Sequence, residues 1–295
     1  MDFINNGHLI RVICALLYIL AAPFIGGFLE GLDRKISARM QGRKGPSVLQ
    51  PFYDFRKLMH KQSMYVNRLQ LMMVVSYLFF ILLTGVLFFA GFDVLMCFFS
   101  LSTAAMFLIM AATSTHSPYA TMGSQRELLQ MMAYEPMVLL TAVGFYLACG
   151  SFRVTDIIAG EVPAIAYAPG FFLGFVFILT IKFRKSPFDL SSSHHAHQEV
   201  VRGITTEMIG REYAAVMMAE WYENVFLLGV VGLFFMTSNP FSIIWTIAAI
   251  LVVYFVEILI DNTSARVNWK LMLKLAWSVT IICGGLNFLI LQLVR

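Results

Sequence analysis

Residues 184–223, RKSPFDLSSSHHAHQEVVRGITTEMIGREYAAVMMAEWYE, lie between strongly apolar segments and carry six carboxylates. These are Asp189, Glu199, Glu207, Glu212, Glu220 and Glu223. The last of them run directly into an apolar segment. A carboxylate inside or at the edge of a bilayer is costly and needs a partner, a proton or a function. We therefore expect the rest of the chain to hold this stretch against a membrane.

The composition predicts an all-α polytopic membrane protein. Of the 295 residues, 59% are hydrophobic and 13% are charged, whereas a soluble domain has about 25% charged residues. This deficit extends along the whole chain, so we expect one integral membrane domain over residues 1–295. The net charge of +4 matters less than its placement, and we expect membrane lipid rather than nucleic acid as a partner.

The four cysteines lie far apart in apolar runs, and no CxxC spacing occurs. Iron–sulfur clusters and structural zinc sites are held by closely spaced cysteines or histidines. We therefore expect no metal and no cofactor to be bound by this chain alone. His194, His195 and His197 invite a metal site, but no second ligand pair at helical spacing accompanies them, and a solvated loop is favoured.

About eight segments are long and apolar enough to be transmembrane helices, because a bilayer span needs about 20 mostly apolar residues. They cover approximately 8–30, 69–91, 94–113, 134–150, 169–183, 213–237, 241–260 and 271–293. The fourth and fifth are short. Cytoplasmic loops are then expected at about 31–68, 114–133, 184–212 and 261–270.

The basic residues predict the orientation of these spans. Eighteen of the 21 Lys and Arg residues fall on one side, and Arg11, Arg153 and Arg295 on the other. Cytoplasmic loops carry an excess of Lys and Arg. Both termini are therefore expected outside and the large basic loops in the cytoplasm.

The first two loops contain helix signals. Arg34, Arg39 and Arg43 would lie near one face of a helix that Gly45-Pro46 ends, and an amphipathic helix should begin at Gln50-Pro51. This basic loop fits either anionic lipid or a docking surface for a partner protein. In the second loop, Pro136 is expected at the first turn of a helix, with Glu135 at the membrane edge as a protonation site or a dipole partner.

Glu212 and Glu223 are eleven residues apart and share a helix face, with Glu220 close to it. A stripe of carboxylates on a membrane helix indicates an interior, wet path, and burial would raise the pKa values toward neutrality. Hydrogen bonding to neighbouring helices is the alternative. Further on, Glu257 and Asp261 are spaced i, i+4, and a local pairing of either with Arg266 is expected.

The run DRKISARMQGRKGPSVLQPFYDFRKL resembles the first cytoplasmic loop of the family that contains the quinone-site membrane subunit of respiratory complex I. The matching positions are Asp33-Arg34-Lys35, Gln41, Arg43, Gly45-Pro46, Gln50, Asp54 and Lys57. Two further elements match in order: Arg126 with Tyr134-Glu135-Pro136, and Ser186-Pro187-Phe188-Asp189-Leu190 followed by Thr206-Glu207, Glu220 and Arg266.

Three departures from complex I resemble the corresponding subunit of group 4 energy-converting [NiFe] hydrogenases of the Ech type, with the formate hydrogenlyase subunit as a cousin. Asp33 stands where complex I has Glu. The loop after PFDL reads SSSHHAHQEVVRGITTE instead of a PEAE-like sequence. The segment GPSVLQP lacks the glycine-rich insertion common in complex I.

This resemblance implies a membrane subunit without a catalytic centre of its own. It would anchor a peripheral arm formed by the hydrogenase small and large subunits, which exchange electrons between ferredoxin and protons through iron–sulfur clusters and a NiFe centre. It would couple that arm to H⁺ or Na⁺ movement in antiporter-like membrane subunits of a prokaryotic cytoplasmic membrane.

The resemblance also implies roles for individual residues. Glu135, Glu207 and Glu220 match the acidic residues proposed to lead charge into the membrane, while Asp189, Glu199, Glu212 and Glu223 are added on spacing. The residues expected to meet the arm are Arg34, Lys35, Arg39, Arg43, Gln50, Asp54, Arg126 and Arg266.

Three alternatives remain. The first is the quinone-site subunit of a complex I-type NADH dehydrogenase. The second is a stand-alone ion transporter, although such proteins often show paired broken helices in two repeated halves and no repeat is visible here. The third is a purely structural anchor, in which the intramembrane carboxylates could be neutralised without loss of function.

Overall fold

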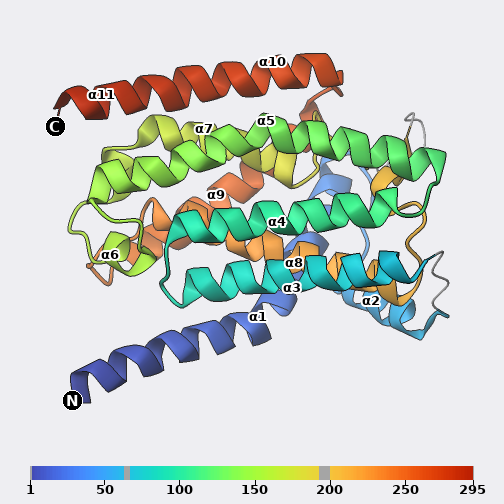
Figure 1. Ribbon diagram of the computed structural model, residues 1–295, viewed down its shortest axis with the longest axis horizontal. Helices are drawn as coiled ribbons and strands as arrows, with labels where there is room; N and C mark the ends of the chain where they lie inside the picture. Colours follow the sequence, from blue (N-terminus) through green and yellow to red (C-terminus); the bar gives the residue numbers. More distant parts are fainter. Residues whose placement is uncertain (1, 63–66, 193–199, 295) are drawn as a thin grey trace.

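The computed structural model describes residues 2–62, 67–192 and 200–294, and within them the chain is an all-α bundle (Figure 1). The α-helices are α1 (Asp2–Met40), α2 (Gln50–His60), α3 (Arg68–Phe89), α4 (Val94–Thr113), α5 (Pro118–Cys149), α6 (Val154–Ile158), α7 (Pro169–Lys182), α8 (Arg211–Leu233), α9 (Ser242–Thr263), α10 (Trp269–Val279) and α11 (Leu286–Val294). Short 3₁₀ turns lie at Ala164–Ala166 (η1) and Gly203–Thr205 (η2), and a π-helical segment at Thr280–Gly285 (η3) joins α10 to α11.

Seven helical segments are long and apolar enough to cross a membrane within the described residues. They confirm the predicted multi-span architecture and include the continuous last segment, Trp269–Leu293. The span predicted at 169–183 is the exception, because α7 has only 14 residues. At about 1.5 Å per residue it reaches about 21 Å, less than the roughly 30 Å hydrocarbon core. Lys185 and Ser186, shortly after the end of α7, are buried within the bundle.

The helices pack in a bundle with α8 at its centre. α8 has the largest buried share among the candidate spans and packs on α1, α3 and α9. In Figure 1, α3, α4 and α5 lie in order across the bundle, the outer half of α1 diverges along one edge, and α10–α11 runs along the opposite edge. Both termini lie at the same end of the molecule. We call the other end, which carries the connections 41–49, 114–117 and 183–192, the basic end.

The predicted loop at 114–133 is wrong for most of its length. α5 begins at Pro118, which takes the first-turn position predicted for Pro136, and Pro136 lies inside the helix. The polar residues 118–133 remain helical because this part of α5 packs against η2: a Cβ on Gly123 would lie 2.4 Å from the Ile204 backbone nitrogen. The polar residues of this segment therefore belong to a helix that packs against other parts of the protein, and not to a loop.

The first predicted loop contains the helix expected from Gln50-Pro51. α2 begins at Gln50 with Pro51 in its first turn. Its aromatic residues Phe52 and Phe55 pack on Trp221 of α8, with ring centroids 5.4 and 5.6 Å apart, while Lys57 is exposed. The amphipathic prediction for this segment is confirmed, although its apolar side faces α8.

A glycine sets the spacing of α1 and α8. A Cβ on Gly26 would lie 2.6 Å from both the Cβ and the carbonyl oxygen of Trp221. Backbone cannot yield as a flexible side chain can, so any larger residue here forces the two helices apart. A Cβ on Gly285, by contrast, would have no heavy atom within 4 Å, so this position offers a matched comparison.

We expect Gly26→Ala to lower the thermal stability of the purified protein, because overpacking costs about 1–3 kcal/mol. Gly285→Ala should leave it unchanged or slightly raise it. Size-exclusion chromatography after a temperature series would compare the two variants. Equal melting of Gly26→Ala and wild type would contradict the close approach of α1 and α8.

Candidate functional site

Three basic side chains at the end of α7 enter the interior of the bundle. Lys182 is the last residue of α7, and Arg184 and Lys185 follow in the turn. Their side chains are only 7%, 15% and 8% exposed. Arg184 adopts a left-handed backbone conformation (φ 50°), which redirects the chain at the end of the helix. Buried cations need counter-charges, and each of these three has at least one.

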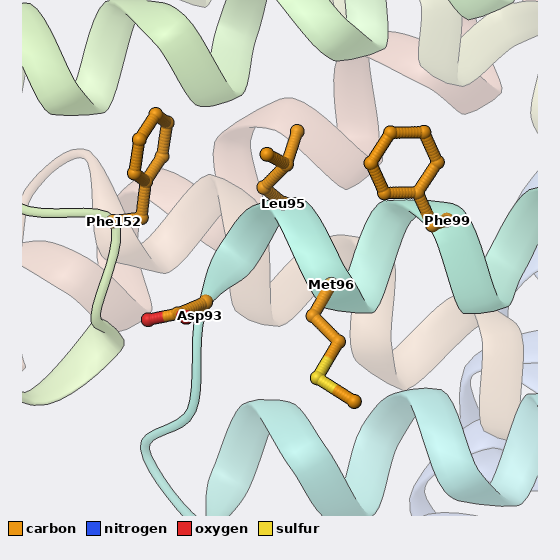
Figure 2. Close-up of a pocket in the computed structure, with 5 residues that line it drawn as sticks. All are labelled: Asp93, Leu95, Met96, Phe99 and Phe152. Carbon is orange, nitrogen blue, oxygen red and sulfur yellow. The ribbon is translucent and has the colours of Figure 1, made fainter.

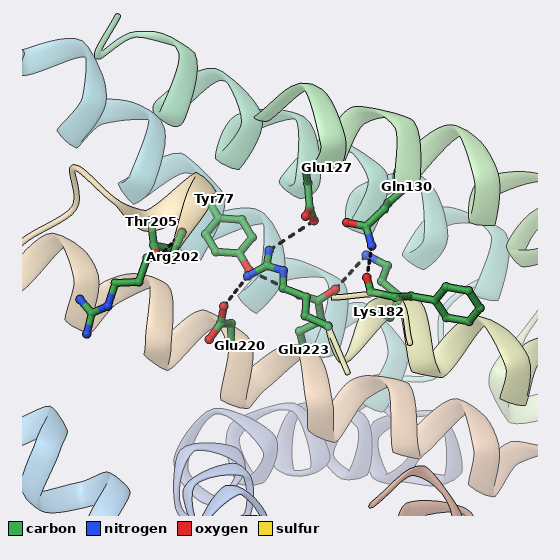
Figure 3. Close-up of polar contacts among 10 residues, drawn as sticks. Tyr77, Glu127, Gln130, Lys182, Arg202, Thr205, Glu220 and Glu223 are labelled. Atoms are coloured by element: carbon green, nitrogen blue, oxygen red, sulfur yellow. Dashed lines mark hydrogen bonds and ion pairs between the residues drawn. The ribbon is translucent and has the colours of Figure 1, made fainter. Parts of the chain in front are cut away.

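Lys182 pairs with Glu223 of α8. Its Nζ lies 2.8 Å from Glu223 Oε1 and 4.5 Å from the centre of the Tyr134 ring. The hydroxyl of Tyr77, on α3, donates to the other oxygen of Glu223 at 3.4 Å. One carboxylate thus joins α3, α7 and α8 (Figure 3).

Arg184 binds two carboxylates on different helices. Its guanidinium lies 2.6 Å from Glu220 of α8 and 3.3 Å from Glu127 of α5. Burial alone lowers the pKa of Arg184, but Glu127 and Glu220 outweigh it and raise the pKa above its usual value. Arg184 therefore stays charged, and it shares that charge between α5 and α8.

A small cavity of about 10 Å³ lies within this group. Its polar lining comes from Tyr77, Glu127, Lys182, Arg184 and Glu223, and its apolar lining from Ile81, Ala105 and Leu108. This is about the space that one water molecule requires. Within the described residues, the buried Oε2 of Glu127 makes no hydrogen bond of acceptable geometry, although the Ser191 hydroxyl lies near this carboxylate.

A second polar group ties α1 to α2 and α8. Arg34 lies 2.9 Å from Asp54 of α2 and 2.5 Å from Glu30 of its own helix. Trp221 donates its indole N–H to Glu30 at 2.5 Å, and Gln50 donates to Asp54 at 3.0 Å. These charges hold the amphipathic helix α2 against the bundle.

The predicted pairing of Arg266 with Asp261 or Glu257 is wrong. Arg266 Nε lies 3.5 Å from a carboxylate oxygen of Asp189, and its guanidinium donates to the Asp189 carbonyl at 3.3 Å. Asp261 accepts the backbone N–H of Ser186 at 2.8 Å. Both residues thus fasten the turn 186–189, because that turn passes directly beside the end of α9.

The predicted acidic residues fall into three groups. Glu220, Glu223 and Asp189 are ion-paired with the cations named above. Glu212 is buried but, among the described residues, has no hydrogen-bond partner for either carboxylate oxygen. Glu135 and Glu207 are half-buried, and in the described part of the chain no hydrogen bond or ion pair joins their side chains to this cluster. Glu199 and the three histidines lie outside the described residues.

The predicted docking residues also divide. Lys35, Arg39 and Arg43 are exposed at the basic end. Arg34, Gln50 and Asp54 are bonded to one another instead. Arg126 is half-buried and donates to the Leu190 carbonyl at 3.4 Å, and Arg266 holds Asp189.

Another hollow lies far from this cluster, beside the first turn of α4. It measures about 220 Å³ and is lined by Asp93, Leu95, Met96, Phe99 and Phe152 (Figure 2). Its one charged lining residue, Asp93, lies 3.9 Å from Arg153. Within the described ranges, no group of three or more potential metal ligands occurs.

The NADH dehydrogenase family profile matches residues 12–292, nearly the whole chain. The chain belongs to this family. It is 27% identical to an NADH-quinone oxidoreductase subunit of Rhodospirillum rubrum, over 97% of this chain and 95% of that one. It is 25% identical to Hydrogenase-4 component C of Escherichia coli, over 92% of this chain and 93% of that one.

Among solved structures, the fold is shared with a chain of the membrane-bound sulfane sulfur reductase, an archaeal respiratory membrane complex. The TM-score is 0.82 at 20% identity, covering 95% of this chain and 99% of the other. The multi-span membrane architecture of this family member therefore matches a solved fold throughout its length.

Sequence reasoning missed four charged residues in this family member: Glu127, Lys182 and Arg184 of the cluster, and Lys185 beside it. Glu127 was placed in a loop, where a carboxylate has no need of a partner. The three cations were counted only for orientation. A usable signal was present, because three basic residues within four positions directly follow an apolar segment too short to cross a bilayer.

We expect Lys182→Met to destabilise the protein strongly, because it leaves the Glu223 carboxylate buried and unpaired, which costs about 3–5 kcal/mol. The double variant Lys182→Met/Glu223→Gln should regain most of that loss. The exposed Lys57→Met serves as the control. Thermal denaturation of Lys182→Met, Glu223→Gln and the double variant, compared with wild type and the control, gives the coupling, and additive losses in the double variant would contradict the ion pair.

Proposed function

We propose that this chain is the membrane anchor and coupling subunit of an energy-converting [NiFe] hydrogenase complex. In this role it links ferredoxin and H₂ chemistry in a peripheral arm to H⁺ or Na⁺ translocation. The observation that carries the proposal is the cluster of Glu127, Arg184, Glu220, Lys182 and Glu223, in which all side chains but that of Glu220 are at most 15% exposed. A structural anchor has no need to bury so many charges, since a hydrophobic replacement is often as stable.

The cluster is suited to respond to charge. Arg184 is shared by two carboxylates on different helices, at 2.6 and 3.3 Å, so small changes in the field decide which of them holds it more closely. Charges interact more strongly in a protein interior than in water. A redox change in a nearby cluster of the arm would therefore alter the protonation of this group and bias the neighbouring membrane subunits.

The exposed basic residues provide a surface on which the peripheral arm would dock. Lys35, Arg39 and Arg43 lie at the basic end, and the Glu220 side chain, which binds the buried Arg184, is 39% exposed. A protein docked there would sit close to the carboxylate cluster. This placement predicts that the basic end faces the cytoplasm of a prokaryotic cell, with both termini on the outside.

One observation supports the hydrogenase over a quinone-site subunit: the sequence after PFDL departs from the complex I pattern. The similarity to Hydrogenase-4 component C, over 92% of the chain, is compatible with this choice. The quinone-site subunit of a complex I-type enzyme is the second candidate, and the similarity to the NADH-quinone oxidoreductase subunit of Rhodospirillum rubrum favours it. The NiFe centre and iron–sulfur clusters belong to the partner subunits in the first case.

Purification in mild detergent through a tag on this chain should bring down hydrogenase large and small subunits, antiporter-like subunits and nickel. Mass spectrometry and metal analysis make the measurement. Flavin and NADH dehydrogenase subunits without nickel would assign the chain to complex I instead. Recovery of the chain alone at full yield would favour the stand-alone transporter.

We expect Glu220→Gln to reduce ion transport per H₂ formed while the complex stays assembled, because it removes a carboxylate that shares Arg184. Glu135→Gln and Glu207→Gln test the other two positions that match the family. Ion uptake into vesicles that contain the complex, divided by H₂ production, is the measurement. Glu161→Gln, at an exposed position, is the control. Wild-type ratios in all three variants would refute a role for these carboxylates.

A further inference from the structure

Glu257 of α9 is a buried carboxyl group that takes no part in the cluster around Arg184. It is 0% exposed. Both of its carboxylate oxygens lack a hydrogen-bond donor among the described residues. An unpaired buried carboxylate is among the costliest groups a protein can hold, so this side chain calls for a physical explanation.

The surroundings of Glu257 are mostly apolar. Its neighbours in α9, Tyr254 and Ile258, form a small core with Leu228 of α8, against which Leu29 and Ile36 of α1 and Phe183 pack. Tyr254 is three residues before Glu257 and Asp261 four after it, so the three lie along one helix face. The Tyr254 hydroxyl does not donate a hydrogen bond to Glu257, because it donates to the Leu29 carbonyl at 2.9 Å.

Two charges act on Glu257: the ammonium of Lys185 and the carboxylate of Asp261. Asp261 already accepts the Ser186 N–H at 2.8 Å. Lys185 Nζ lies 2.9 Å from Asp33 of α1 and 5.0 Å from the centre of the Tyr254 ring. Lys185 therefore stands between α1 and α9, with a carboxyl group on each side.

The contacts of Lys185 are incomplete. Its ammonium is close to Asp33, yet within the described residues none of its N–H groups makes a hydrogen bond of acceptable geometry. An ammonium has three donors. Lys185 therefore has donors free to bond a second carboxylate.

The two acids that flank Lys185 differ in exposure. The Asp33 side chain is 21% exposed and also accepts from the Ser37 hydroxyl at 3.2 Å. Asp33 can thus lose Lys185 and remain solvated. Glu257 has no such support, so it tolerates a negative charge only when Lys185 is bonded to it.

We propose that Glu257 is a proton-binding site, and that Lys185 moves from Asp33 to Glu257 when the proton leaves. In the protonated state Glu257 is neutral and Lys185 pairs with Asp33. On deprotonation the proton passes to water at the exposed side of Asp33, and the carboxylate of Glu257 takes the ammonium. The site lies apart from the Arg184 cluster and does not depend on which redox complex the chain serves.

This exchange would connect α1, α9 and the turn after α7. Lys185 is one residue from Arg184 and one from Ser186, whose N–H binds Asp261. A shift of Lys185 would thus act on the same turn that positions Arg184. Occupancy of Glu257 by a proton would regulate that turn from the α9 side.

The test is infrared spectroscopy of the purified complex in lipid nanodiscs at neutral pH, in H₂O and D₂O. We expect Glu257→Gln to remove the intensity of one protonated carboxyl group from the C=O stretching region. Glu257→Asp, which keeps the acid, should shift that band instead. Glu161→Gln, at an exposed site, should leave it unchanged. Size-exclusion chromatography confirms that each variant complex is assembled.

A second variant tests the exchange itself. Asp33→Asn leaves Lys185 with Glu257 and Asp261 as the carboxyl groups near it. Asp261 already accepts the Ser186 N–H, so Lys185 should bond Glu257, and the carboxyl band of Glu257 should weaken or vanish although Glu257 is intact. An unchanged spectrum in Glu257→Gln would overturn the proton site. A band that persists in full in Asp33→Asn would overturn the movement of Lys185.

Discussion

The structure depends on the need to neutralise three cations that the chain carries into the bundle between residues 182 and 185. Lys182, Arg184 and Lys185 are each at most 15% exposed. Their counter-charges come from different helices: Glu223 and Glu220 from α8, Glu127 from α5 and Asp33 from α1. An unpaired charge in such a site costs several kcal/mol. The turn after α7 therefore fixes how α1, α5 and α8 stand relative to one another, and the glycine contacts between α1 and α8 are adjusted to the same arrangement.

The need to neutralise these cations also explains why α7 is so short. A helix of 14 residues is too short for a bilayer when lipid surrounds it. Here its last residue points a cation at Glu223, and the next turn is covered by α5, α8 and α9. Irregular backbone is tolerated at membrane depth where protein buries it. Ser186 and Asp189 supply the necessary contacts, since the backbone N–H of Ser186 binds Asp261 and the carboxylate of Asp189 pairs with Arg266.

Much of the fold could be predicted from sequence because hydrophobic length is a direct consequence of bilayer thickness. The bounds of α4, α7 and α9 fall within three residues of expectation. The site was harder to predict, since a polar segment in a membrane protein can be either a loop or a helix that packs against other protein. Residues 118–133 are of the second kind, and the prediction of a loop there placed Glu127 wrongly. Glu220 and Glu223 were found because they interrupt an apolar helix, whereas the partners of Lys182 and Arg184 depend on packing between distant helices, which spacing along one chain does not encode.

The buried carboxyl groups of this chain differ in what holds their charge, and this difference bears on mechanism. Glu223 has both a lysine and a tyrosine hydroxyl within hydrogen-bonding range, so each of its oxygens has a donor and it serves as the counter-ion of Lys182. Glu220 and Glu127 share one guanidinium, and a proton on either would release Arg184 to the other. Glu257 has no fixed donor among the described residues. Under the two proposals above, sites of the last two kinds would change charge while a neighbouring cation moves to the carboxylate that remains. Since Arg184 and Lys185 are adjacent, both cations share one backbone turn, and a change of protonation at one carboxyl group would then alter the position of the cation that the next one needs.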